Sequence, residues 1–92
     1  MNIREYNKYH QEMYDALDKP IGVGDTVVAN NYYKASVHIG KVSHFTESGR
    51  VAIKTSTVYG KTRYEYFIYR LPFTIIVIKK SRKKKDYDNL HL

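Results

Sequence analysis

The fold is decided by residues 23–54, which read VGDTVVANNYYKASVHIGKVSHFTESGRVAIK. Apolar and polar residues alternate along much of this stretch and β-branched residues are frequent, which is typical of half-buried strands. Turn-forming residues interrupt the pattern at Asn30-Asn31 and at Glu47-Ser48-Gly49, where glycine can take a positive φ without steric cost. The stretch therefore predicts three strands, at Asp25–Asn30, His38–Thr46 and Arg50–Thr55.

The strand pattern continues toward the C-terminus. Gly60-Lys61 predicts a turn into a fourth strand at Arg63–Arg70, and Pro72, which cannot donate to a strand ladder, suits the corner before a fifth strand at Phe73–Lys79. Five short strands with tight turns are too few for a large sandwich, so we expect a small, partly open barrel. Its core is predicted from the inward positions of the strands: Val27, Val42, Phe45, Val51, Ile53, Ile68, Ile75 and Val77.

The residues before the strands have a helical period instead. Asn2 and Glu5 form a capping-box pattern, and proline and glycine from Pro20 onward end the periodic segment. We therefore expect one amphipathic helix over residues 2–17. Because residues 75–78 form a continuous apolar run, we expect the helix to cover that strand on its second face. The apolar stripe of the helix consists of Ile3, Tyr6, His10, Met13, Tyr14 and Leu17.

The size of the chain, 92 residues, allows one domain. We expect residues 1–79 to form a single helix-plus-barrel domain and residues 80–92 a basic tail that is disordered when free. The chain contains no cysteine, which suits a reducing cytoplasm, and no apolar run approaches the roughly 20 residues that span a bilayer. The expected location is therefore cytoplasmic.

Positive charge is concentrated in the middle and at the end of the chain. Residues 1–25 carry 3 basic and 5 acidic side chains, residues 26–78 carry 7 and 2, and residues 79–92 carry 6 and 2, which gives net charges of −2, +5 and +4. Such an excess favours a polyanionic partner, because lysines that neutralise phosphates release counterions. An ordinary solvated surface is the alternative interpretation. The candidate phosphate-binding residues of the predicted strands and loops are Lys34, Lys41, Arg50, Lys54, Lys61 and Arg63.

Two further groups could extend such a surface. Tyrosines expected in loops among the lysines could stack on unpaired bases, or they could close one end of the barrel. The basic tail could follow phosphates in a groove, or it could serve only solubility or localisation. The tyrosines are Tyr32, Tyr33 and Tyr59, and the basic residues of the tail are Lys80, Arg82, Lys83, Lys84 and Lys85.

Catalytic and metal-binding patterns are missing from the sequence. The four histidines have no metal-ligand spacing, and there is no phosphate-cradling glycine loop or nucleophile elbow. Ser43 and His44 are neighbours in a predicted strand, so their side chains should project to opposite faces and cannot act as nucleophile and base. We therefore expect no enzymatic activity, no cofactor and no metal. With no acylation signal and no lipid-facing helix, no membrane partner is expected either.

Two short elements of the first stretch resemble the KOW motif. Residues 24–27, Gly-Asp-Thr-Val, match its opening strand, and residues 40–42, Gly-Lys-Val, match the Gly-x-Val element that follows. The resemblance covers about a third of the chain and implies a five-stranded SH3-like barrel of the kind found in ribosomal proteins and transcription factors. The tyrosine- and lysine-rich composition is also similar to small DNA-binding early proteins of T-even-type bacteriophages, which implies a modulator of host transcription or of the nucleoid.

These observations lead to one main functional hypothesis and two alternatives. We expect a monomer or weak dimer that binds double-stranded DNA mainly through phosphates, with low sequence specificity. The first alternative is a protein-interaction module that docks on and inhibits a host or partner protein through barrel loops or an exposed strand, with the charge only steering the encounter. The second alternative is binding to RNA or to the ribosome.

Overall fold

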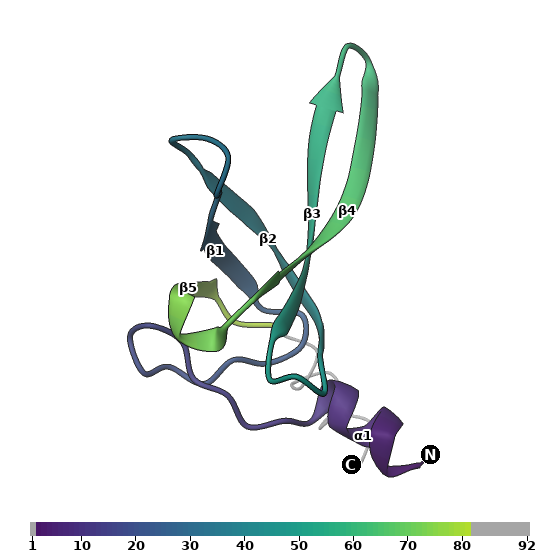
Figure 1. Ribbon diagram of the computed structural model, residues 1–92, viewed down its shortest axis with the longest axis vertical. Helices are drawn as coiled ribbons and strands as arrows, with labels where there is room; N and C mark the ends of the chain where they lie inside the picture. The colour runs from purple at the N-terminus through teal and green to yellow at the C-terminus, as the bar shows by residue number, and fades with distance from the viewer. Residues whose placement is uncertain (1, 82–92) are drawn as a thin grey trace, which may run out of the picture.

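The computed structural model describes residues 2–81 and contains one helix and five strands. The strands form a single antiparallel sheet in the order β4-β3-β2-β1-β5, and the β3–β4 hairpin extends away from the rest of the molecule (Figure 1). The prediction of a mainly β chain with one N-terminal helix is confirmed. No helix within these residues is long and apolar enough to span a membrane. The elements are α1 (Ile3–Tyr9), β1 (Thr26–Asn30), β2 (Val37–Phe45), β3 (Val51–Tyr59), β4 (Thr62–Arg70), the 3-10 turn η1 (Pro72–Thr74) and β5 (Ile75–Lys79).

The hydrophobic core contains most of the predicted residues. Ile68 is the exception, because it is only partly buried and packs against the core from its margin. Met13 and Ile21, which the sequence placed in or just after a helix, are buried in the core as well. The predicted residues that are buried are Val27, Val42, Phe45, Val51, Ile53, Ile75 and Val77.

The helix is much shorter than predicted. Its start is confirmed, because Asn2 Oδ1 accepts a hydrogen bond from the Glu5 backbone N–H at 2.9 Å. It ends at Tyr9 instead of residue 17, and none of its residues is buried. The helical spacing of apolar residues continues beyond Tyr9, but the backbone there forms non-helical hydrogen bonds. The N–H of Ile21, for example, donates to the carbonyl of Met13 at 2.9 Å.

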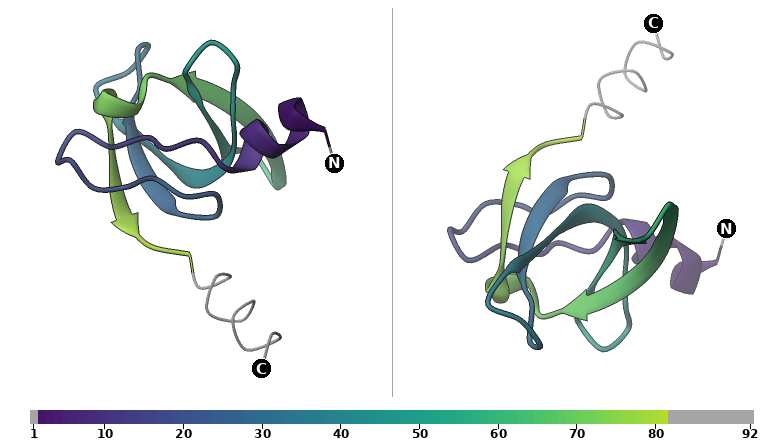
Figure 2. Two further views of the ribbon diagram at one scale, coloured as in Figure 1. Left: turned by 90° about the horizontal axis from the view of Figure 1, so that it is seen from below. Right: turned by 90° about the horizontal axis from the view of Figure 1, so that it is seen from above.

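Residues 10–25, which we call the N-terminal arm, cover the outer edge of β5 (Figure 2). The N–H of Ala16 donates to the carbonyl of Ile75 at 2.9 Å, and Asp15 Oδ2 accepts from the N–H of Val77 at 2.8 Å. These contacts satisfy backbone groups that a sheet edge would otherwise expose. The expected cover of residues 75–78 by a helix face is therefore wrong, since the arm protects the edge of the strand and Ile78 stays exposed.

Asp15 is the polar anchor of the arm. Its buried carboxylate accepts the backbone N–H groups of Leu17, Lys19 and Val77 at 2.8–2.9 Å. Burial by itself would raise the pKa of Asp15, but the three N–H donors and the nearby Lys19 charge outweigh it and hold the pKa below the ordinary value of 3.8. The carboxylate is therefore ionised in the folded protein at neutral pH.

Replacing Asp15 with asparagine is expected to lower the free energy of unfolding by about 1–3 kcal/mol at pH 7, because an amide cannot accept all three N–H groups. A carboxylate whose pKa is lowered by folding stabilises the protein above its unfolded pKa and loses that effect as pH falls. The difference between wild type and Asp15→Asn should therefore shrink as pH falls below 3.8. Urea unfolding from pH 7 to pH 3 measures this, and a difference independent of pH would contradict it.

The sheet is strongly curved. Arg70, at the end of β4, donates from Nη2 and Nε to the carbonyl of Asn30, at the end of β1, at 2.9 and 3.3 Å. These two strands are separated by β3 and β2 in the sheet order, so the contact requires the sheet to bend back on itself. A bulge between Val42 and His44 in β2 adds to this bend. No pairing between β4 and β5 closes the sheet within the described residues.

Candidate nucleic-acid interface

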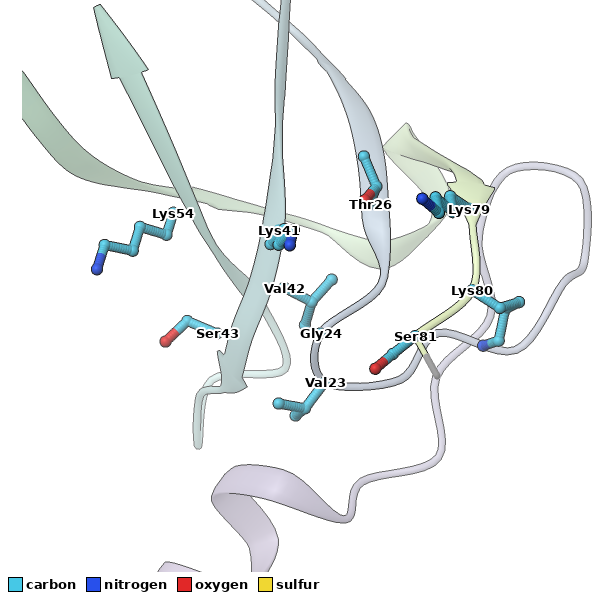
Figure 3. Close-up of a pocket in the computed structure, with 10 residues that line it drawn as sticks. All are labelled: Val23, Gly24, Thr26, Lys41, Val42, Ser43, Lys54, Lys79, Lys80 and Ser81. Carbon is cyan, nitrogen blue, oxygen red and sulfur yellow. The ribbon is translucent and has the colours of Figure 1, made fainter. Parts of the chain in front are cut away.

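Three lysines lie in one line across the outer face of the sheet. Lys54 of β3 is directly opposite Lys41 of β2, Lys41 is opposite Thr26 of β1, and Thr26 is opposite Lys79 of β5. Directly opposite residues project on the same side of a sheet. The neighbouring register pair of Lys41 and Lys54 is buried in the core, so this line faces away from the core. We call Lys54, Lys41 and Lys79 the lysine row (Figure 3).

The lysine row borders a shallow hollow of about 580 Å³ with no acidic residue in its lining. Because neighbouring strands lie about 5 Å apart, the row extends roughly 15 Å from Lys54 to Lys79. Lys41 and Lys79 are exposed and form no ion pair within residues 2–81. Thr26 adds a hydroxyl between them, so the row offers two uncompensated ammonium groups and one hydroxyl to an anionic ligand.

The β4 side of the lysine row is partly neutralised. Lys54 Nζ lies 3.0 Å from Glu65 Oε2, and both side chains are more than half exposed. Arg63 lies beside them and lines a second small hollow together with Lys41, Lys54 and Glu65. Two of the predicted residues, Lys41 and Lys54, therefore belong to the row, and Arg63 continues it toward the tip of the hairpin.

Lys79 was missing from the predicted site, and Lys80 was included in it. Strand alternation from the buried Val77 would turn Lys79 toward the core, but a register shift between Thr26 and Val27 brings Lys79 opposite Thr26 on the outer face. Lys80 instead donates from Nζ to Asp25 Oδ2 at 2.6 Å. The charge of Lys80 is therefore neutralised by an ion pair within the domain.

The remaining predicted residues lie elsewhere. Arg50 immediately precedes β3 and Lys61 is at the tip of the β3–β4 hairpin, so neither belongs to the row. Tyr59 is the last residue of β3 and not a loop residue, because β3 extends four residues beyond its predicted end at Thr55. The predicted tail residues Arg82, Lys83, Lys84 and Lys85 lie outside the described residues.

The predicted tyrosines are brought together on the other side of the sheet. Tyr66 of β4 is opposite the buried Thr55, so it projects toward the core side, where a cleft of about 800 Å³ separates the β1–β2 loop from the β3–β4 hairpin. We call this space the aromatic cleft. Its lining includes Tyr32, Tyr33, Lys34, Tyr59, Tyr66 and Arg70. The predicted Lys41 and Lys54 therefore lie on one surface, and Lys34 and the three predicted tyrosines lie on another.

Ser43 and His44 differ from the sequence expectation. Because the bulge in β2 falls at Ser43, the two side chains do not point apart, and Ser43 Oγ lies 3.0 Å from His44 Nδ1. Burial, with a smaller contribution from the Lys8 charge, lowers the pKa of His44 below 6.5. No carboxylate within residues 2–81 hydrogen-bonds His44, so the pair lacks the third group that orients a catalytic histidine.

No protein-family model, curated protein or solved structure was found to match this chain. Within residues 2–81 there is no group of three histidine, aspartate or glutamate side chains that could hold a metal ion.

Proposed function

We propose that this chain is a non-enzymatic DNA-binding protein that holds the phosphates of double-stranded DNA with the lysine row. The observation that carries the proposal is the register that aligns Lys54, Lys41 and Lys79 on neighbouring strands of one exposed face. Lysine ammonium groups attract phosphates without reading base edges. Binding of this kind has low sequence specificity and depends strongly on salt.

The rigid spacing of the lysine row supports a phosphate ligand in particular. Lys41 and Lys79 lie on β2 and β5, which flank β1 and both pair with it, so the sheet fixes the spacing of the two charges, and no carboxylate lines the hollow beside them. Keeping like charges together is unfavourable in the free protein, and a phosphate backbone relieves this repulsion while it releases counterions. A row of roughly 15 Å is long enough to reach several successive phosphates, which rise about 3.4 Å each along a strand.

We further propose that the curved sheet is an SH3-like barrel of the KOW type. The link between Arg70 and the carbonyl of Asn30 and the 3-10 turn before β5 support this closure. The two elements that resemble the KOW motif also meet in the lysine row, since one contributes Thr26 and the other contributes Lys41. The resemblance and the candidate interface therefore share Thr26 and Lys41.

Reversing two charges of the lysine row tests the proposal. In fluorescence anisotropy with labelled duplexes at several salt concentrations, Lys41→Glu/Lys79→Glu is expected to weaken binding more than about tenfold at low salt. The loss should be similar for unrelated duplex sequences. The slope of log affinity against log salt should become shallower by about 2, because two phosphate contacts are lost.

The matched control is Lys8→Glu/Arg50→Glu, which changes the net charge equally at exposed sites outside the row. This variant should retain most of the affinity and the wild-type salt slope. Glu65→Gln should bind a few-fold more tightly, because it releases Lys54 from its ion pair. If the control loses as much affinity as the row variant, total charge and not the row governs binding, and the proposal is wrong.

One observation favours protein docking as a second candidate function. The outer edge of β4 has no strand partner within the described residues, whereas the arm covers the edge of β5. An uncovered edge of this length can accept an extended segment of another protein by β-augmentation. Backbone pairing of that kind would survive salt concentrations that abolish phosphate binding, so a partner captured at high salt would support this alternative.

A further inference from the structure

We infer that the aromatic cleft is a second nucleic-acid site, which takes unpaired bases of a single-stranded segment. This inference rests on the proposed function because it assumes a nucleic-acid ligand. It uses different residues, however, on the side of the sheet opposite the lysine row. The two sites can therefore be tested separately.

The exposed aromatic rings of the cleft are the first reason to infer that it binds unpaired bases. Tyr33 is 94% exposed, Tyr59 69% and Tyr32 65%, although all three line one cleft and come from two different segments of the chain. The volume of about 800 Å³ lies within the range of small-ligand sites, roughly 300–1,000 Å³. Flat rings exposed along such a cleft suit stacking on successive bases, which tolerates any base sequence.

Tyr32 is held in place before any ligand arrives. The guanidinium carbon of Arg70 lies 4.1 Å from the centre of the Tyr32 ring. Arg70 itself is 7% exposed and is fixed by hydrogen bonds to the carbonyls of Asn30 and Tyr69 at 2.9 and 3.0 Å. A ring that is already ordered loses less conformational entropy on binding, so this stack favours a planar ligand.

The charge of the cleft distinguishes between two classes of ligand that aromatic clefts bind, planar rings and quaternary ammonium groups. Lys34 and Arg70 line it, and no aspartate or glutamate does. Aromatic clefts also bind quaternary ammonium groups, but here a cationic ligand would meet two positive side chains without a compensating carboxylate. A nucleotide combines a flat ring with a negative phosphate, and so it matches both the tyrosines and the basic residues.

The test compares a single-stranded oligothymidylate carrying one 2-aminopurine with a duplex of equal length, at one low salt concentration. Tyr33→Ala is expected to weaken single-strand binding by roughly 5- to 100-fold, the effect of losing one base–aromatic stack. It should also reduce the quenching of 2-aminopurine fluorescence that stacking produces. Duplex affinity should change less than about twofold, because the lysine row is intact.

Two control variants separate stacking from structural effects. Tyr33→Phe keeps the ring and should bind single strands like wild type, whereas Tyr9→Ala removes a 44%-exposed tyrosine from α1, outside the cleft, and should have no effect. Thermal unfolding should be unchanged in all three variants, because neither tyrosine is buried.

The outcomes for the two sites are distinguishable. If wild type binds the duplex but not the single strand, or if Tyr33→Ala binds the single strand with wild-type affinity, the inference about the cleft is wrong and the proposed function stands. If wild type binds the single strand through Tyr33 but does not bind the duplex, the cleft inference stands and the proposed function of the lysine row is wrong. If neither nucleic acid binds, both are wrong.

Discussion

Replacing Asp25 with alanine is expected to lower the free energy of unfolding by about 3 kcal/mol, the largest single effect that we predict on stability. Asp25 is 1% exposed, and its carboxylate has three partners. Oδ2 accepts from the N–H of Gly22 at 2.8 Å and from Lys80 Nζ at 2.6 Å, and Oδ1 accepts from the N–H of Ser81 at 2.8 Å. Alanine would remove the acceptor that these donors share.

Urea unfolding at neutral pH measures this effect, with Lys80→Met as the matched comparison. Removing Lys80 leaves both backbone N–H groups bound to Asp25, and the Lys80 side chain is itself half exposed, so the loss should be at most about 1 kcal/mol. A loss of less than about 0.5 kcal/mol for Asp25→Ala would show that water replaces the carboxylate at these donors.

Gly40→Ala is expected to be almost as destabilising, by about 2–3 kcal/mol. A Cβ atom at Gly40 would press against the backbone carbonyl of Lys54 and would lie 2.9 Å from Ile53 Cγ2. The obstacle is the backbone of β3, which cannot move aside as the end of a flexible side chain can. Because Lys54 belongs to the lysine row, the same substitution should also reduce duplex affinity by displacing β3 from β2.

The matched control for Gly40 is Gly22→Ala. An added Cβ at Gly22 would find its nearest neighbour, Asp25 Oδ2, at an ordinary contact distance of 3.5 Å. The free energies of unfolding of the two variants, measured by chemical or thermal unfolding, should therefore differ clearly, and that of Gly22→Ala should be close to the wild-type value. Equal stability of the two variants would contradict the close approach of β2 and β3 at Gly40.

The strands and most of the core could be predicted from the sequence because they depend on local alternation. Val42 lies between the polar residues Lys41 and Ser43, and Gly49 takes the positive φ expected of its turn. The end of the helix could not be predicted in this way. The spacing of Met13 fits a helix, but its carbonyl pairs with Ile21, and this tertiary competition outweighs local periodicity.

The candidate site, like the fold, could be predicted from the sequence only in part. Lys41 and Lys54 follow from alternation in regular strands, whereas Lys79 depends on a register shift opposite Thr26, which has no local sequence signal. The role of Lys80 depends on Asp25, more than fifty residues earlier in the chain. Lys79 and Lys80 look alike in the sequence. The structure leaves Lys79 able to bind a ligand, whereas Asp25 holds Lys80 within the domain.

The hydrogen bond between Asp25 and the N–H of Ser81 also determines when the protein can complete its fold during synthesis. The arm and β1 leave the ribosome before β5, the strand that pairs with both of them. The two residues are 56 positions apart, so at about 5–20 residues per second the early segment waits roughly 3–11 s for its partner. Until then Asp25 lacks its partners Lys80 and Ser81, and the nascent domain carries an incomplete sheet in which the β5 side of β1 is an unpaired edge.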